Sequence, residues 1–108
     1  MSTATIQYVV STAIPAQSEA RNNKTPAVLN IAYTDANGVE QSLINYNSPS
    51  GSWSLTFTGT VGNMYHLNAK DIQNFSIVTC TVYENGSSVA TANNASNVNI
   101  KAGVAGTI

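Results

Sequence analysis

Charged side chains are scarce in this chain. Of its 108 residues, four are basic and five are acidic, which gives a formal net charge of −1, whereas about a quarter of an average globular chain is charged. No cluster of lysine or arginine is present that could follow a phosphate backbone or an anionic lipid surface. The sequence therefore argues against a nucleic acid partner, and solubility must rest on serine, threonine and asparagine.

Cysteine and histidine occur once each, as Cys80 and His66. A lone cysteine excludes an intramolecular disulfide, and its β-branched neighbours favour a buried, inert thiol in a strand. Zinc sites need several Cys or His ligands, and the carboxylates are too scattered for a calcium loop or an acid–base pair. His66 has no acidic residue at a spacing that predicts contact. We therefore expect no catalytic residues, no metal and no cofactor.

Long apolar runs are also missing. No stretch of about 18 apolar residues occurs, and no basic segment precedes a short apolar one, so the sequence predicts neither a membrane span nor a signal peptide within these residues. Surfaces rich in Ser, Thr and Asn are common among exported bacterial β-domains. We therefore expect an extracytoplasmic location, in the periplasm, at the cell surface or secreted, with any leader already removed.

Short segments of alternating apolar and polar residues run along the chain, with the period of two that is typical of β-strands. The apolar positions of four segments are Ile6, Tyr8 and Val10; Leu29, Ile31 and Tyr33; Trp53, Leu55 and Phe57; and Tyr65, Leu67 and Ala69. A fifth segment, from Phe75 to Tyr83, is rich in β-branched and aromatic residues, and its Ile77, Val78 and Val82 predict a central strand buried on both faces. The predicted structural core includes Trp53, Leu55, Phe57, Ile77 and Val82.

Two dipeptides mark hairpin turns, because asparagine and glycine tolerate positive φ. They are Asn37-Gly38 and Asn85-Gly86. The tail from Asn93 to Ile108 alternates weakly at Val98 and Ile100 and then becomes small and glycine-containing, which fits either a final strand or a mobile end. The whole chain, residues 1–108, is thus predicted to be one all-β domain, an immunoglobulin-like antiparallel β-sandwich of about seven strands, with a small barrel as the alternative.

The aromatic residues have two interpretations. Trp53 could stack on a sugar or a partner, but its alternation with Leu55 and Phe57 favours a core position. Tyr33, Tyr46, Tyr65 and Tyr83 are expected to present an exposed edge.

Three stretches carry a resemblance to a known family. They run from Val28 to Gly38, from Ser52 to Leu55 and from Val78 to Gly86. In order and spacing they resemble the extracytoplasmic domain of the MmpS family, small actinobacterial envelope proteins with an immunoglobulin-like β-sandwich. The resemblance implies a membrane-anchored accessory protein of a lipid transporter, without catalytic residues. The chain departs from the family in its single cysteine, Cys80, and in Ser52, which replaces the usual proline before tryptophan.

Two functional hypotheses follow, neither of them an enzyme. The first is an accessory or binding domain of the cell envelope, with a protein partner, or a lipid as a further candidate ligand. The second is a structural subunit of an extracellular filament or surface layer, which self-associates by pairing its terminal strands with neighbouring molecules.

Overall fold

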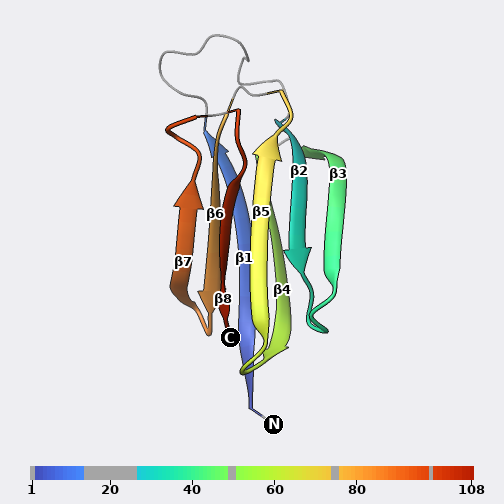
Figure 1. Ribbon diagram of the computed structural model, residues 1–108, viewed down its shortest axis with the longest axis vertical. Helices are drawn as coiled ribbons and strands as arrows, with labels where there is room; N and C mark the ends of the chain where they lie inside the picture. The colour runs from blue at the N-terminus through green and yellow to red at the C-terminus, as the bar shows by residue number, and fades with distance from the viewer. Residues whose placement is uncertain (1, 14–26, 49–50, 74–75, 98) are drawn as a thin grey trace.

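The computed structural model describes residues 2–13, 27–48, 51–73, 76–97 and 99–108, which form eight β-strands in two layers (Figure 1). The strands are β1 (Thr3–Ala13), β2 (Ala27–Thr34), β3 (Glu40–Ser48), β4 (Ser52–Thr60), β5 (Met64–Asp71), β6 (Ile77–Glu84), β7 (Ser87–Asn93) and β8 (Ala102–Thr107). The first sheet has the order β4-β1-β6-β7, and the second has the order β3-β2-β5-β8. All neighbouring strands are antiparallel. The predicted all-β sandwich is confirmed, with eight strands where about seven were expected.

The second sheet, taken as β8-β5-β2-β3, has the order of the G, F, C and C′ strands of an immunoglobulin variable sheet. The β6–β7 hairpin belongs to the other sheet and lies in sequence between β5 and β8.

The first and last strands occupy different positions in their sheets. β1 is paired on both sides, with β4 and with β6, whereas β8 lies at the edge of its sheet.

The core lies between the two sheets because alternation sends every second side chain to the inner face. In β1, Ile6, Tyr8 and Val10 are all fully buried, as their spacing predicts. The second sheet contributes Leu29 and Leu67, which are equally inaccessible. Each such side chain contributes about 1.5–3 kcal/mol when it is fully buried. Over the described residues, the buried cluster consists of Ala4, Ile6, Tyr8, Val10, Leu29, Ile31, Tyr65, Leu67, Ala69, Val78, Cys80, Val82 and Ala102.

Ile77 does not belong to this cluster. The strand that contains it, β6, is central, as predicted, but its inner face carries Val78, Cys80 and Val82. Ile77 lies on the outer face and is only partly buried. The prediction of burial on both faces is therefore wrong, because each antiparallel sheet of a sandwich keeps one face toward solvent.

The two predicted turns join neighbouring strands. In the β6–β7 hairpin, Asn85 and Gly86 have φ values of 52° and 86°, the two positive values that a type I′ turn requires. In the β2–β3 hairpin, Gly38 has φ of 76°. There the Asp35 carboxylate accepts the backbone N–H groups of Asn37 and Val39 at 2.9 and 3.0 Å.

The C-terminal segment ends in a strand, but not where the alternation suggested. Ile100 is exposed and lies in a turn, Val98 lies outside the described residues, and β8 forms from the small residues that follow. The chain end is held at the β4–β5 turn. The Gly62 N–H donates to the Ile108 carbonyl at 2.7 Å, and the Ile108 N–H donates to the Asn63 carbonyl at 2.8 Å.

Candidate functional site: an open strand edge

In the part of the chain that the structure describes, four strands lie at the edges of the two sheets: β4 and β7 in the first, β3 and β8 in the second. An edge strand presents unpaired N–H and C=O groups, which can pair with a strand of another chain. Proteins commonly prevent such pairing by placing charges, bulges or prolines on the edge, or by keeping the edge strand short. The four edges of this protein differ in these protections.

Three of the edges carry a protection. Strand β3 begins with the charged Glu40 and contains a bulge, at which Asn45 adopts φ of 56°. Strand β7 is bulged as well. Val82 and Tyr83 are adjacent in β6, but their partners in β7, Ala90 and Ser88, are separated by Val89, which has no partner residue in β6. Strand β8 has six residues.

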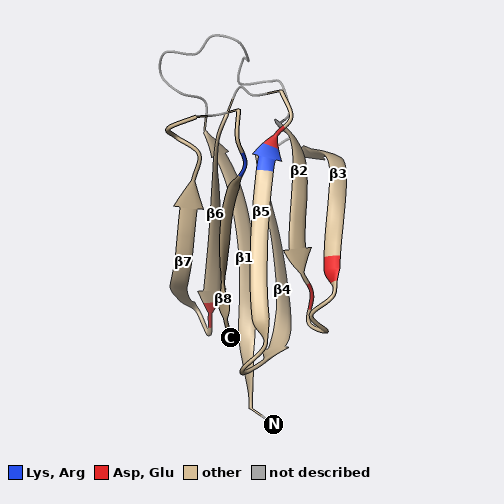
Figure 2. Cartoon of the chain, in the orientation of Figure 1, with Lys and Arg blue, Asp and Glu red and all other residues tan. Residues whose placement is uncertain are grey.

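Strand β4 lacks these protections. It has nine residues, none of them charged and none of them proline, and Figure 2 shows it without a coloured position. Its register with β1 runs from Thr3↔Thr60 to Ser11↔Ser52 without a shift. It is therefore the longest regular edge among the described strands.

The register also shows which backbone groups of β4 are open. The Val61 N–H donates to the Ser2 carbonyl at 3.0 Å, which makes these two residues a hydrogen-bonded pair. Such pairs alternate with non-hydrogen-bonded pairs along an antiparallel ladder. The backbone groups of Trp53, Leu55 and Phe57 therefore face β1, and those of the intervening serine and threonine residues face away from it.

Contacts on the far side of β1 support this assignment. Thr5 lies opposite Thr58, yet its carbonyl accepts the Asn85 N–H at 2.8 Å and its own N–H donates to Asn85 Oδ1 at 2.9 Å. At the end of the edge, the Ser48 hydroxyl donates to the Ser52 carbonyl at 2.7 Å. Among the described residues, the open part of β4 is therefore formed by Ser54, Thr56 and Thr58, whose side chains are exposed. We call these three residues the β4 edge.

The inner face of β4 is incompletely covered. Trp53, Leu55 and Phe57, predicted as core residues, pack against the buried cluster but keep part of their surface accessible. The Phe57 ring meets Tyr8 edge-on, with ring centroids 5.2 Å apart, and Trp53 lies against Tyr33 at the same distance. Their partial exposure follows from the position of β4, which has a neighbouring strand on one side only within the described sheet.

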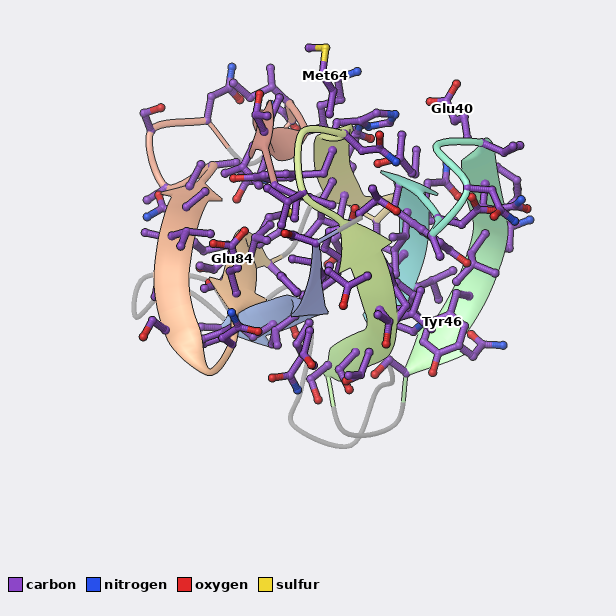
Figure 3. All side chains as sticks on the ribbon, turned by 90° about the horizontal axis from the view of Figure 1, so that it is seen from below. Glu40, Tyr46, Met64 and Glu84 are labelled. Carbon is purple, nitrogen blue, oxygen red and sulfur yellow. The ribbon has the colours of Figure 1, made fainter. Side chains whose placement is uncertain are left out.

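His66 has an acidic neighbour that its sequence context did not indicate. Its Nε2 atom lies 3.3 Å from Glu40 Oε1, because β5 and β3 both flank β2. Figure 3 shows Glu40 at the rim of the molecule, and its side chain is 64% exposed. The described contacts of this pair include no hydroxyl or thiol on the imidazole, so the geometry does not assemble a nucleophile with its base.

Two buried acceptor atoms lie where β5 ends. Asp71 is fully buried and accepts the Gln73 N–H through Oδ1 at 2.9 Å. Its Oδ2 atom and the Oε1 atom of Gln73 have no hydrogen-bond partner among the described residues. No set of three or more His, Cys, Asp or Glu residues is placed to hold a metal ion in the described ranges.

Cys80 is buried, as its neighbours predicted, and burial raises the pKa of its thiol to about 12.

The described segments contain no helix of the length and apolarity needed to traverse a lipid bilayer. Neither the models of known families nor the curated proteins contain a match to this chain.

Proposed function

We propose that this protein is a non-catalytic, extracytoplasmic interaction domain that binds by accepting a strand of another polypeptide along the β4 edge. The observation that carries this proposal is the nine-residue, unbulged and uncharged strand β4, whose outward backbone groups lie at exposed Ser54, Thr56 and Thr58. Strand addition of this kind derives its affinity from main-chain hydrogen bonds. The partner must therefore supply an extended segment.

An extracytoplasmic location fits the charge-poor, Ser-, Thr- and Asn-rich composition. The resemblance to the MmpS family points the same way, toward an envelope accessory protein. The interior supports a protein partner over a lipid held between the sheets, because the side chains that fill the intersheet space, from Ile6 and Tyr8 to Leu67 and Val82, are fully buried. A lipid could enter there only if the sheets separated.

A structural subunit of an extracellular filament or surface layer is the second candidate. It is favoured by the presence of further uncharged edges, β7 and β8, in addition to β4. A subunit that polymerises needs at least two contact surfaces. Electron microscopy of the purified protein tests this form of the proposal, and regular filaments or layers are the expected result.

Peptide selection tests the proposed function without assuming a partner. Random peptides displayed on phage are selected on the folded chain and counter-selected on Thr56→Pro, which removes an outward N–H while leaving the β1–β4 ladder intact. We expect extended peptides with alternating apolar residues, whose binding shifts the amide resonances of Ser54, Thr56 and Thr58. Peptides that bind Thr56→Pro equally well, or that shift resonances elsewhere, would contradict the proposal.

A further inference from the structure

We propose that the strand accepted by β4 is β4 of a second copy of this chain, in an antiparallel arrangement related by a two-fold axis. This inference rests on the proposed function, because it names the partner of the same edge. A two-fold contact requires a surface that is complementary to itself. The charge, the backbone and the side chains of β4 each meet that requirement.

Charge is the first requirement. Near a two-fold axis, each residue of the edge lies close to the same residue of the second copy, or to residues next to it in sequence. A lysine or glutamate on the edge would therefore be repelled by the same charge on the second copy. Strand β4 carries no charge between Ser52 and Thr60. The two whole chains also repel each other only weakly, because each has a formal net charge of −1.

The backbone supplies the hydrogen bonds in the correct positions. A two-fold axis at Leu55 pairs Ser54 of each copy with Thr56 of the other. Ser54 and Thr56 are residues whose N–H and C=O groups face away from β1, as the register shows. Both pairs can therefore exchange two hydrogen bonds, and the first sheet continues across the axis as a single eight-stranded sheet with the ladder unbroken.

The side chains complete the match. In the same register, Leu55 faces Leu55 and Trp53 faces Phe57 of the second copy. These are non-hydrogen-bonded pairs, in which side chains approach most closely. They are also the inner-face residues that remain partly exposed in the single chain. Pairing thus covers apolar surface that the isolated sandwich leaves accessible, while the serine and threonine side chains stay on the solvated face.

The expected dimer is weak. A contact built from one strand edge is small compared with stable interfaces, which bury about 1,200–2,000 Å². We therefore expect a dissociation constant between about 1 μM and 1 mM. The association must be measured over that range of protein concentration.

Cysteine cross-linking tests the register. Ser54→Cys and Thr56→Cys place thiols at exposed positions, while native Cys80 stays buried and protonated. We expect a mixture of the two variants to form a disulfide-linked heterodimer under mild oxidation, and each variant alone to form much less. Efficient cross-linking of Ser54→Cys to itself would place Ser54 opposite its own copy and would overturn the register centred on Leu55, as would the absence of any heterodimer at millimolar concentration.

Sedimentation equilibrium tests the edge itself. Thr56→Pro, and separately Thr56→Lys, should raise the dimer dissociation constant about tenfold or more. Proline removes a hydrogen bond from each copy, and lysine places two like charges at diagonally neighbouring positions across the axis. Ser11→Lys is the matched control, since Ser11 is exposed on the same sheet but lies on β1, which is paired on both sides. A dimer weakened equally by Ser11→Lys, or unchanged in both Thr56 variants, would overturn the inference. A chain that stays monomeric but binds selected peptides at β4 would overturn the inference and leave the proposed function standing.

Discussion

The amide oxygen of Asn94 accepts the buried backbone N–H of Val78 at 2.7 Å, and the Asn94 side-chain N–H₂ group donates to the Ile100 carbonyl at 2.8 Å. Asn94 is 1% exposed. One side chain thus joins the start of β6 to the connection between β7 and β8. No apolar residue could replace it without leaving polar backbone groups unpaired.

Replacing Asn94 by alanine should therefore lower the free energy of unfolding by about 2–4 kcal/mol, because a buried N–H and a carbonyl both lose their partners. Chemical denaturation measures the effect. Asn93→Ala is the control: Asn93 is exposed and its Oδ1 atom accepts one N–H, that of Ala95, at 2.9 Å, so its loss should cost about 1 kcal/mol or less. Equal costs for the two variants would show that burial of the Asn94 amide does not matter.

Gly106 lies under the ring of Tyr65, its cross-strand partner on β5. A Cβ atom at this glycine would lie 2.5 Å from Tyr65 Oη and 2.7 Å from Cζ. Gly106→Ala should thus destabilise the fold by about 1–3 kcal/mol, as overpacking does. At Gly103, on the same strand, the nearest atom to such a Cβ is 3.2 Å away, and Gly103→Ala should cost less. Thermal unfolding of both variants checks the order, and the reverse order would be inconsistent with this packing.

Acid should weaken the β2–β3 hairpin through Asp35. Hydrogen bonds from the Val39 N–H, the Gln41 side chain and the Asn37 N–H lower the pKa of this carboxyl group. A lowered folded-state pKa gives stability that is present above the unfolded value of about 3.9 and is lost as the pH falls through the folded value. Asp35→Asn should therefore be less stable than the natural chain at pH 7 and match it at about pH 2. A stability difference that persists undiminished in acid would contradict this linkage.

The Cys80 thiol should be inert in the native protein. Burial raises its pKa to about 12, so almost no thiolate is present at pH 8. A thiol reagent should label the native chain only at the rate at which the fold opens, and should label the exposed thiol of Thr56→Cys at once. Rapid labelling of Cys80 without denaturant would show that the intersheet space is open to solvent.

Local patterns predicted much of this fold. The alternation of Ile6, Tyr8 and Val10 identified a strand and its buried face, and Asn85-Gly86 identified a two-residue turn, because both signals depend on neighbours in sequence. The last strand was harder to place. The sequence alternates only weakly, at Val98 and Ile100, and left a final strand and a mobile end both open, whereas β8 forms from small residues that gain their order by pairing with β5.

The candidate site could not be predicted in the same way. Trp53, Leu55 and Phe57 were identified as inward-facing, but whether their strand is central or at an edge depends on long-range pairing. The contact of His66 with Glu40 likewise results from β5 and β3 flanking β2, and not from any sequence spacing. Tyr65 was expected to expose an edge, yet only 6% of its surface is exposed, because Gly106 leaves room for its ring.

The most direct test of strand addition at β4 is the amide hydrogen exchange of Thr56, followed by NMR across a range of protein concentrations. In the single chain this N–H faces solvent, so it should exchange rapidly at micromolar concentration and become protected, together with the amide of Ser54, as the dimer forms. We predict that protection of these two amides increases with protein concentration. In the Thr56→Pro variant, the amide of Ser54 should stay unprotected. Rapid exchange of Thr56 at every concentration, with association detected elsewhere or not at all, would contradict pairing of β4 with a second copy.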